Sequence, residues 1–311
     1  MSNSSNQISL RVLAIGSGLL SALLFSACGG GGDGAAPTTP AVTSADITYT
    51  SATVLSSNVN HVTAIDAAPE ISSDYLELYF HSDRSGNFDI YVATRTDVSQ
   101  AWGVATAVAE LNTASNDVAP ALSSDGLTMI FASNRAGGQG GNDLYVSTRA
   151  MLNAAWSTPA NIGGLNTAAA EAGPSLSDDG LSLYFHSDAA GGFGNTDIYV
   201  STRASLAANW GAPVNLGTNV NSVDFDLAPD IASDGLSLYF HTTRTGGPGG
   251  AHDIWRSTRA STSDPWQAAQ AVAAPVNSMV SDLAPSLSDD WQSIYYASDT
   301  GGNRDIWEAN P

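Results

Sequence analysis

The feature that most constrains this chain is a sequence pattern of roughly 54 residues that occurs five times. Each copy has a proline, a turn signal that contains serine and aspartate, and an Asp-Ile-Tyr-like element. The prolines are Pro69, Pro120, Pro174, Pro229 and Pro285. The segments between copies contain a tryptophan and end in a hydrophobic residue followed by asparagine. A period of this length, built from short apolar strands and turns, is typical of propeller blades with four antiparallel strands.

Composition supports an all-β fold and excludes one class of partner. Hydrophobic residues make up 43% of the chain and charged residues only 13%, with 30 glycines and 13 prolines. This composition favours many short strands joined by turns. The formal net charge is −20, and the chain contains no lysine. A basic stripe for phosphate binding cannot be assembled, so we expect no nucleic-acid partner.

The third copy illustrates the strands that we expect in each blade. A short innermost strand should contain the proline, because Pro is tolerated near a strand start. Residues 177–180 (Ser-Asp-Asp-Gly) then read as a hairpin turn. Residues 181–185 and 197–200 are predicted as the second and third strands, and the tryptophan segment as the fourth and outermost strand.

The fifth copy lacks a fourth strand, because the sequence ends just after its third strand. Residues 47–60 precede the first copy and end in Val59-Asn60, as the segments between copies do. We therefore predict that they complete the last blade and close the ring, which removes the exposed sheet edges of an open array. The expected fold is one five-bladed β-propeller over residues 43–311, functioning as a monomer.

The N-terminal residues predict export and a lipid anchor. Arg11 precedes an apolar stretch over residues 12–25 that is too short to span a bilayer. Phe25-Ser26-Ala27-Cys28 resembles the lipobox of bacterial lipoproteins, which implies a signal peptide over residues 1–27 and lipidation of Cys28. Gly29 after the cysteine then implies the outer membrane, facing the periplasm or the cell surface. Residues 28–42 read as a flexible Gly/Pro tether, so membrane contact is expected through the lipid anchor only.

The repeat also resembles a known family. The run Asp-Leu-Ala-Pro-Asp-Ile-Ala-Ser-Asp-Gly-Leu-Ser-Leu-Tyr-Phe-His over residues 226–241, followed by Asp-Ile-Trp over 253–255, is similar to TolB-type, or WD-like, β-propeller repeats. The resemblance covers nearly all of the chain after the tether. It implies a propeller that presents a channel mouth or a rim to another molecule.

Five acidic residues occupy the same position of the repeat, three residues before each proline: Asp66, Asp117, Glu171, Asp226 and Asp282. In a closed ring they should lie near one mouth of the central channel. Carboxylates arranged in this way could bind Ca²⁺ or Mg²⁺, or could act as general acid and nucleophile on a sugar. Alternatively, they could cap backbone N–H groups in every blade. No cofactor is required, and Ca²⁺ is a possible ligand of these carboxylates.

Arginines and histidines also recur, and we expect structural roles for them. The arginines form two repeated sets, Arg84, Arg135 and Arg244, and Arg95, Arg149, Arg203 and Arg259, which we expect to pair with the aspartates of the Asp-Ile-Tyr elements. His81, His186 and His241 share one position that is alanine in the other two copies, which favours strand histidines over metal ligands. The sequence contains no Gly-x-Ser-x-Gly motif of serine hydrolases, no His-Glu-x-x-His motif of zinc peptidases and no phosphate loop.

Two functions fit these patterns. The first is a non-catalytic, lipid-anchored binding or scaffold module that contacts an envelope protein, peptide or glycan. The second is a glycan-acting hydrolase or lyase with axial carboxylates. Such an enzyme should break the repeat symmetry with unlike acids on different blades. At the position analysed above, only Glu171 differs from aspartate, and this near-symmetry favours the binding module.

Overall fold

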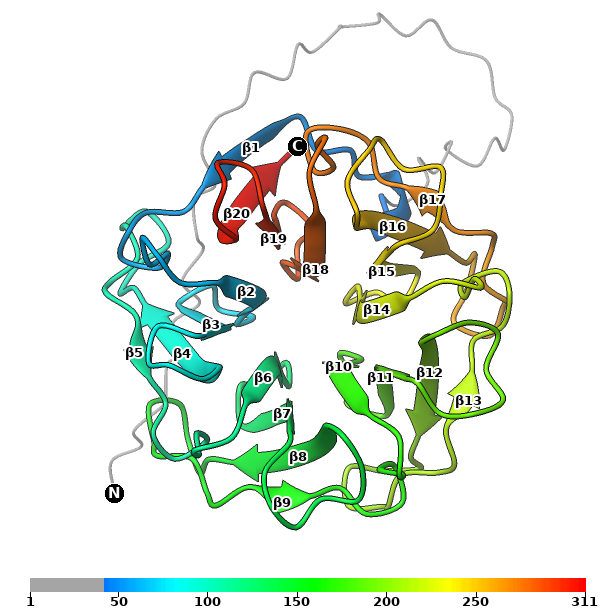
Figure 1. Cartoon of the computed structure of the whole chain (residues 1–311), viewed down its shortest axis with the longest axis horizontal. Coiled ribbons are helices and arrows are strands. Elements are labelled where there is room, and N and C mark those ends of the chain that lie inside the picture. The colour runs from blue at the N-terminus through cyan, green and yellow to red at the C-terminus, as the bar shows by residue number, and fades with distance from the viewer. Residues whose placement is uncertain (1–41) are drawn as a thin grey trace, which may run out of the picture. The chain divides into compact units, whose positions relative to one another are not determined.

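A computed structural model describes residues 42–311 and has twenty strands in five four-stranded sheets around a central axis (Figure 1). In each sheet the strands are antiparallel and follow one another from the axis outward. The predicted five-bladed propeller is therefore confirmed. The only helical element among these residues is a short 3-10 turn, η1 (Ser44–Asp46).

The first three blades are continuous in sequence. Blade 1 contains β2 (Asp66–Ile71), β3 (Glu77–Ser82), β4 (Asp89–Thr94) and β5 (Thr106–Ala107). Blade 2 contains β6 (Asp117–Leu122), β7 (Thr128–Ser133), β8 (Asp143–Thr148) and β9 (Ala160–Asn161). Blade 3 contains β10 (Glu171–Leu176), β11 (Ser182–Ser187), β12 (Asp197–Thr202) and β13 (Val214–Asn215).

The last two blades differ in how they are completed. Blade 4 contains β14 (Asp226–Ile231), β15 (Ser237–Thr242), β16 (Asp253–Thr258) and β17 (Gln270–Ala271). Blade 5 contains β18 (Asp282–Leu287), β19 (Ile294–Ser298), β20 (Asp305–Asn310) and the N-terminal strand β1 (Ser51–Val54).

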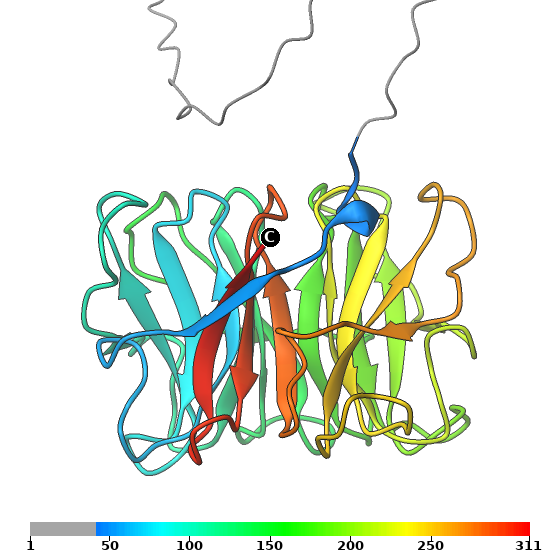
Figure 2. The same ribbon diagram turned by 90° about the horizontal axis from the view of Figure 1, so that it is seen from above.

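Strand β1 closes the ring as the sequence predicts. It pairs antiparallel with β20, from Ser51 opposite Asn310 to Val54 opposite Trp307. Figures 1 and 2 show the blue β1 along the red β20, so the first and last segments of the propeller share one sheet. Beyond the strand, the side chain of Asn60 accepts from the Ile306 backbone N–H and donates to its carbonyl oxygen.

The asparagine before each blade makes two side-chain hydrogen bonds to the third strand of the preceding blade, as Asn60 does. In blade 1, Asn112 Oδ1 accepts from the Ile90 N–H at 2.7 Å and its Nδ2 donates to the Ile90 carbonyl at 2.9 Å. Asn60, Asn166, Asn221 and Asn277 make the equivalent pair of bonds. One amide thus replaces a residue of a fourth strand. The outermost strands β5, β9, β13 and β17 have only two residues each, whereas β1 has four.

Each innermost strand has a bulge immediately before its proline. Ala68, Ala119, Gly173, Ala228 and Ala284 have φ between 44° and 57°, and the pairing register shifts at each of them. These five residues and the five prolines converge on the axis, where they leave a cavity of only about 20 Å³. The channel is therefore narrow at the level of these residues.

Three histidines join neighbouring blades beside these bulges. The backbone N–H of Ala119 donates to His81 Nδ1 at 3.2 Å, and those of Ala228 and Ala284 donate to His186 and His241, both at 3.1 Å. Burial lowers the pKa of His81 and of His186 to about 4. Each imidazole is therefore neutral near pH 7, as an acceptor nitrogen requires.

Candidate functional site: the axial carboxyl pair

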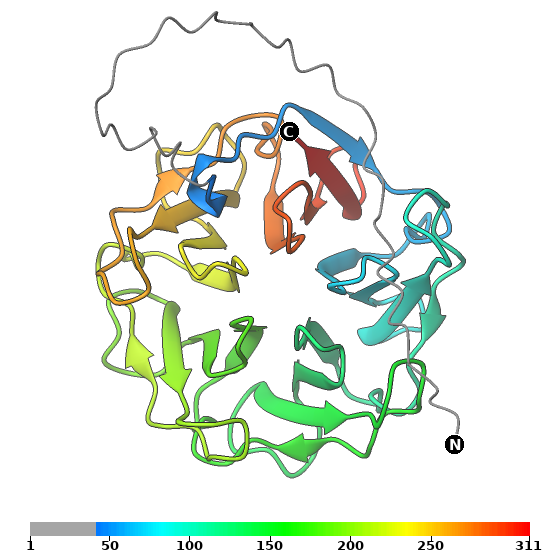
Figure 3. The same cartoon turned by 180° about the vertical axis from the view of Figure 1, so that it is seen from behind.

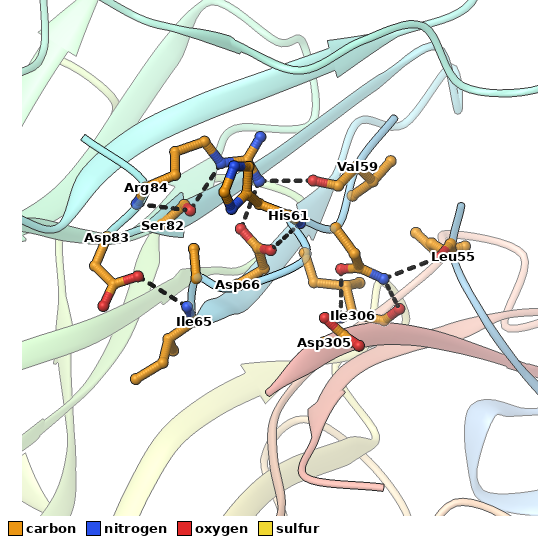
Figure 4. Close-up of polar contacts among 12 residues, drawn as sticks. Leu55, Val59, His61, Ile65, Asp66, Ser82, Asp83, Arg84, Asp305 and Ile306 are labelled. Carbon is orange, nitrogen blue, oxygen red and sulfur yellow. Dashed lines mark hydrogen bonds and ion pairs between the residues drawn. The ribbon is translucent and has the colours of Figure 1, made fainter. Parts of the chain in front are cut away.

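The five predicted acidic residues lie inside the propeller wall and are at most 1% exposed. Each begins an innermost strand and accepts a hydrogen bond from the backbone N–H of a residue just upstream, at the end of the preceding segment. Figure 4 shows Asp66, which accepts from the His61 N–H at 2.6 Å and from Arg84 at 2.5 Å. None of the five lines one of the described cavities.

The charge of these carboxylates is neutralised in three blades. Arg84 and Arg135 pair with Asp66 and Asp117 at 2.5 Å, and Arg244 pairs with Asp226. The same arginines donate to the carbonyl that precedes the repeated asparagine, as Arg84 does to Val59 (Figure 4). Since a buried charge is costly unless it is paired, this arrangement stabilises the junction between consecutive copies.

Blades 3 and 5 lack the arginine and use hydroxyl groups instead. Glu171 accepts from Thr167 Oγ1 at 2.6 Å and from Ser187 Oγ at 3.0 Å. Asp282 accepts from the backbone N–H and the hydroxyl of Ser278 at 2.6 and 2.8 Å. The five acids thus make local contacts in the wall and are not gathered at an open channel mouth.

The expectation that the arginines pair with the Asp-Ile-Tyr aspartates is wrong. The first set pairs with the innermost strands, as described above. The second set lies over the repeated tryptophans, with the Arg95, Arg149, Arg203 and Arg259 guanidinium carbons 4.2–4.6 Å from the ring centroids. The aspartates instead accept from their own loops: the Gln139 N–H, for example, donates to Asp143 Oδ2 at 2.6 Å. In blade 1 the donors to Asp89 are the side chains of Ser85 and Asn87, so loop backbone and loop side chains take the place of the expected ion pairs.

The repeat symmetry is broken at another position, directly after the prolines. The residues there are Glu70, Ala121, Ser175, Asp230 and Ser286. Glu70 and Asp230 are unlike acids on blades 1 and 4, and both line one cavity near the axis. These two residues were not identified from the repeat pattern, although their departure from small side chains was a usable signal.

Hydrogen bonds between blades hold this axial pair. The Leu122 N–H of blade 2 donates to Glu70 Oε1 at 2.7 Å, and the Leu287 N–H of blade 5 donates to Asp230 Oδ2 at 2.8 Å. Ser286 Oγ lies 3.4 Å from Glu70 Oε2, and Ser175 Oγ lies 3.3 Å from Asp230 Oδ1. All four carboxyl oxygens therefore face a protein donor.

The electrostatic environment favours a protonated form of this pair. Burial, and secondly the charge of Asp230, raise the pKa of Glu70 well above its usual range. Burial raises the pKa of Asp230 to about 7, although its hydrogen bonds to Leu287 and Ser175 act in the opposite direction. Two buried carboxyl groups with raised pKa values are a candidate acid–base pair, and also a source of instability when both ionise.

The cavity that reaches this pair is small. Its volume is about 50 Å³, and Ser73, Ser124, Asp178, Ser233 and Asp289 from the five hairpin turns surround its mouth. Pockets for small organic ligands usually have volumes of about 300–1,000 Å³. The space admits a few water molecules and is too small for a sugar ring.

Two of the hairpin turns carry aromatic residues where the other three have glycine. Tyr75 and Trp291 adopt φ values of 61° and 60°, a region that bulky residues rarely occupy. Tyr75 Oη accepts from the Asp290 N–H at 3.1 Å, and Trp291 Nε1 donates to Ser233 Oγ at 3.0 Å. The face that carries these turns, called the turn face below, is thus asymmetric: the turns of blades 1, 4 and 5 are linked by aromatic side chains.

The residues that the structure describes provide neither a metal cluster nor a membrane-spanning helix. Within residues 42–311, no three His, Cys, Asp or Glu side chains are grouped so that they could share a metal ion. The same part of the chain has no helix with the length and apolarity needed to cross a membrane. Cys28 and most of the predicted tether lie outside the described residues.

Comparisons with known proteins identify the fold. No protein-family model matches the chain, and no curated protein matches its sequence. An α-L-arabinofuranosidase from Lactobacillus brevis matches with a TM-score of 0.56 and 14% identity, over 81% of this chain and 92% of that one. A thermostable family-43 glycoside hydrolase matches with a TM-score of 0.54 and 12% identity, over 80% and 89%.

TolB from Acinetobacter baumannii is also among the structural neighbours, with a TM-score of 0.47 and 16% identity. The match covers 79% of this chain but only 54% of that protein. Structural neighbours of this five-bladed propeller thus include TolB propellers and glycoside hydrolases, and at such identities the likeness extends to the fold.

The axial pair predicts a specific pH dependence of stability. Below about pH 3.8 both carboxyl groups are protonated whether the chain is folded or unfolded. As the pH rises to about 7, the unfolded chain releases protons that the folded pair retains, so folding stability should fall. Asp230→Asn removes this penalty. The melting temperature of Asp230→Asn minus that of the parent should therefore be at least about 2 °C larger at pH 8 than at pH 5.

Calorimetry at both pH values measures this difference. A substitution without a titratable group provides the control: Gln100→Ala, at an exposed residue, should change the melting temperature equally at both. The buried histidines affect stability in the opposite direction, with loss on acidification from about 6.5 to about 4, but they are the same in all three proteins. A pH-independent difference between Asp230→Asn and the parent would contradict this assignment.

Proposed function

We propose that this protein is a non-catalytic binding or scaffold propeller of the bacterial cell envelope, anchored through a lipid on Cys28. It presents its turn face, around the channel mouth, to an envelope protein, peptide or glycan. The observation that carries the proposal is that the axial carboxyl pair makes hydrogen bonds between blades and is reached only by a small cavity. Glu70 and Asp230 serve as acceptors between blades at the end of a cavity of about 50 Å³.

A catalytic carboxyl group needs an oxygen atom that can contact the substrate. The shortest contacts of Glu70 and Asp230 are instead to backbone N–H groups of blades 2 and 5. Breaking such a bond would leave a buried donor unsatisfied, which costs about 1–3 kcal/mol. This structural use of the pair, together with the small cavity, favours binding at the rim over chemistry at the axis.

The turn face has the features of a recognition surface. Aspartates recur in all five hairpin turns: Asp74, Asp125, Asp178, Asp179, Asp234, Asp289 and Asp290. They produce a negative potential that would attract a partner of complementary charge and orient it. Tyr75 and Trp291 add partly exposed aromatic surface on one side of the same rim. Aromatic side chains are among the residue types enriched in interfaces.

A photo-crosslinking residue placed at one of two positions tests which face of the propeller contacts the partner. Gln292 is exposed in a hairpin turn of the turn face, and Gln139 is exposed in a β7–β8 loop at the opposite end of the strands. We expect a discrete cross-linked species in intact cells with the crosslinker at position 292 and none with it at 139. Cross-linking from position 139 alone, or from neither position, would contradict the proposal.

The alternative function is a glycan-acting hydrolase or lyase. One observation favours it: unlike acids, Glu70 and Asp230, lie together near the axis with raised pKa values. Glycosidases use such a pair as acid and nucleophile or base. The named glycoside hydrolases in the comparison share the fold. This function would require the cavity to widen and the interblade bonds to be released when substrate binds.

Hydrolysis assays distinguish the two functions. With aryl α-L-arabinofuranosides, aryl β-xylosides and xylan, the parent protein should release product no faster than the Glu70→Gln, Asp230→Asn double variant. That variant preserves the side-chain shapes and removes both acids. Activity in the parent that the double variant loses would establish the enzyme and overturn the non-catalytic proposal.

A further inference from the structure

We propose that a second cleft, at the junction between the N-terminal segment and blade 4, binds the carboxylate group of a small, partly apolar ligand. Its volume is about 180 Å³, and Ile47, Tyr49, Tyr239, Arg256, Gln270 and Val272 are among its lining residues. It is distinct from the axial cavity and shares no lining residue with it.

Arg256 is a departure from the repeat. The equivalent position of the third strand is Val92, Val146 and Val200 in blades 1 to 3, and Glu308 in blade 5. Within residues 42–311, Arg256 forms no salt bridge. Its Nη1 lies 3.3 Å from both the Ile47 carbonyl oxygen and Tyr239 Oη. A guanidinium group has five N–H donors, so further donors remain for a ligand.

Tyr49 supplies an independent indication of a ligand. Its side chain is only 4% exposed, and its buried hydroxyl group lies near that of Tyr239 but makes no hydrogen bond of normal distance and angle among the described residues. Buried polar groups nearly always have partners, so an exception that lines a cleft beside an arginine suggests a missing acceptor. Burial raises the pKa of Tyr49 and of Tyr239, so both phenols keep their protons as donors at physiological pH.

The charge and shape of the cleft indicate which class of ligand it can bind. A guanidinium group binds a planar carboxylate through two parallel bonds, and nearby phenol groups can donate to the same oxygens. The nearby Asp46 carboxylate accepts instead from the N–H and hydroxyl of Thr43, both at 2.9 Å. Ile47 and Val272 provide apolar surface in the cleft. A carboxylate on a short apolar group fits these features, either as a free small acid or as the C-terminus of a peptide.

Matched probes test this proposal on the purified full chain. Butyrate and its neutral isostere butyramide separate charge recognition from apolar binding. Acetyl-Ala-Ala and its C-terminal amide test the peptide source in the same way, and inorganic phosphate tests a tetrahedral anion. By calorimetric or NMR titration, we expect at least one of the two carboxylates to bind at least tenfold more tightly than its amide. The carboxylate that binds more tightly shows whether the natural ligand is a free small acid or the C-terminus of a peptide.

Three variants assign the binding to this cleft. Arg256→Gln should weaken carboxylate binding at least tenfold, whereas Arg203→Gln should not affect it. Arg203 is a suitable control because it donates to the Gly180 and Leu206 carbonyls and lies over Trp210. Tyr49→Phe should weaken binding without lowering the melting temperature, because the removed hydroxyl makes no hydrogen bond of normal geometry within residues 42–311.

Equal binding of acid and amide, or full binding by Arg256→Gln, would overturn the proposal. So would binding of phosphate without binding of either carboxylate. A lower melting temperature of Tyr49→Phe would also count against it, because the hydroxyl would then have a partner within the protein.

Discussion

The closure of this propeller depends on the pairing of β1 with β20. Without it, blade 5 would have three strands, and the outer edge of β20 would expose unpaired backbone groups. The pairing also positions what precedes β1: Ser44 bonds the Asp234 carboxylate of blade 4 through its N–H and its hydroxyl, at 2.9 and 2.8 Å. Figure 3, from the opposite side, again shows β1 completing the blade of the C-terminal strands. Ring closure therefore also forms the cleft at Tyr49 and Arg256.

Inside the closed ring, polar contacts join each blade to its neighbours. Three histidines accept backbone N–H groups of the next blade beside the bulges, and the axial residues accept N–H groups of adjacent blades. The arginine–carboxylate pairs act within single blades, at the strand starts. Ser286 and Ser175 accept from the Ile71 and Ile231 N–H groups at 3.4 and 3.1 Å, much as Glu70 accepts from Leu122. A serine is thus sufficient for this structural role. The choice of Glu70 and Asp230 in two blades adds a titratable pair to a contact that does not need one.

The fold could be predicted from the sequence because the repeat counts the blades and the residues before the first copy match the missing segment. The candidate site was harder to predict. The bulge at each positive-φ residue interrupts strand alternation, so simple counting does not show that Glu70 and Asp230 face the axis. The spacing of asparagine and tryptophan could not show that an asparagine side chain takes the place of a fourth-strand residue. Tyr75, Trp291 and Arg256 departed visibly from the repeat, but their neighbours come from other blades or from the N-terminal segment, which only the folded ring brings together.

The measurement that tests this account most directly compares two truncations by thermal unfolding. Deleting residues 47–60 removes β1 and Asn60, and so exposes β20 and the apolar cluster that contains Tyr296 and Ala309. Deleting residues 29–40 leaves all described residues in place. The account predicts that the first truncation aggregates or melts far below the parent, while the second keeps the parent's melting temperature. Equal melting temperatures for the two truncations would contradict it, because the ring would then hold together without β1.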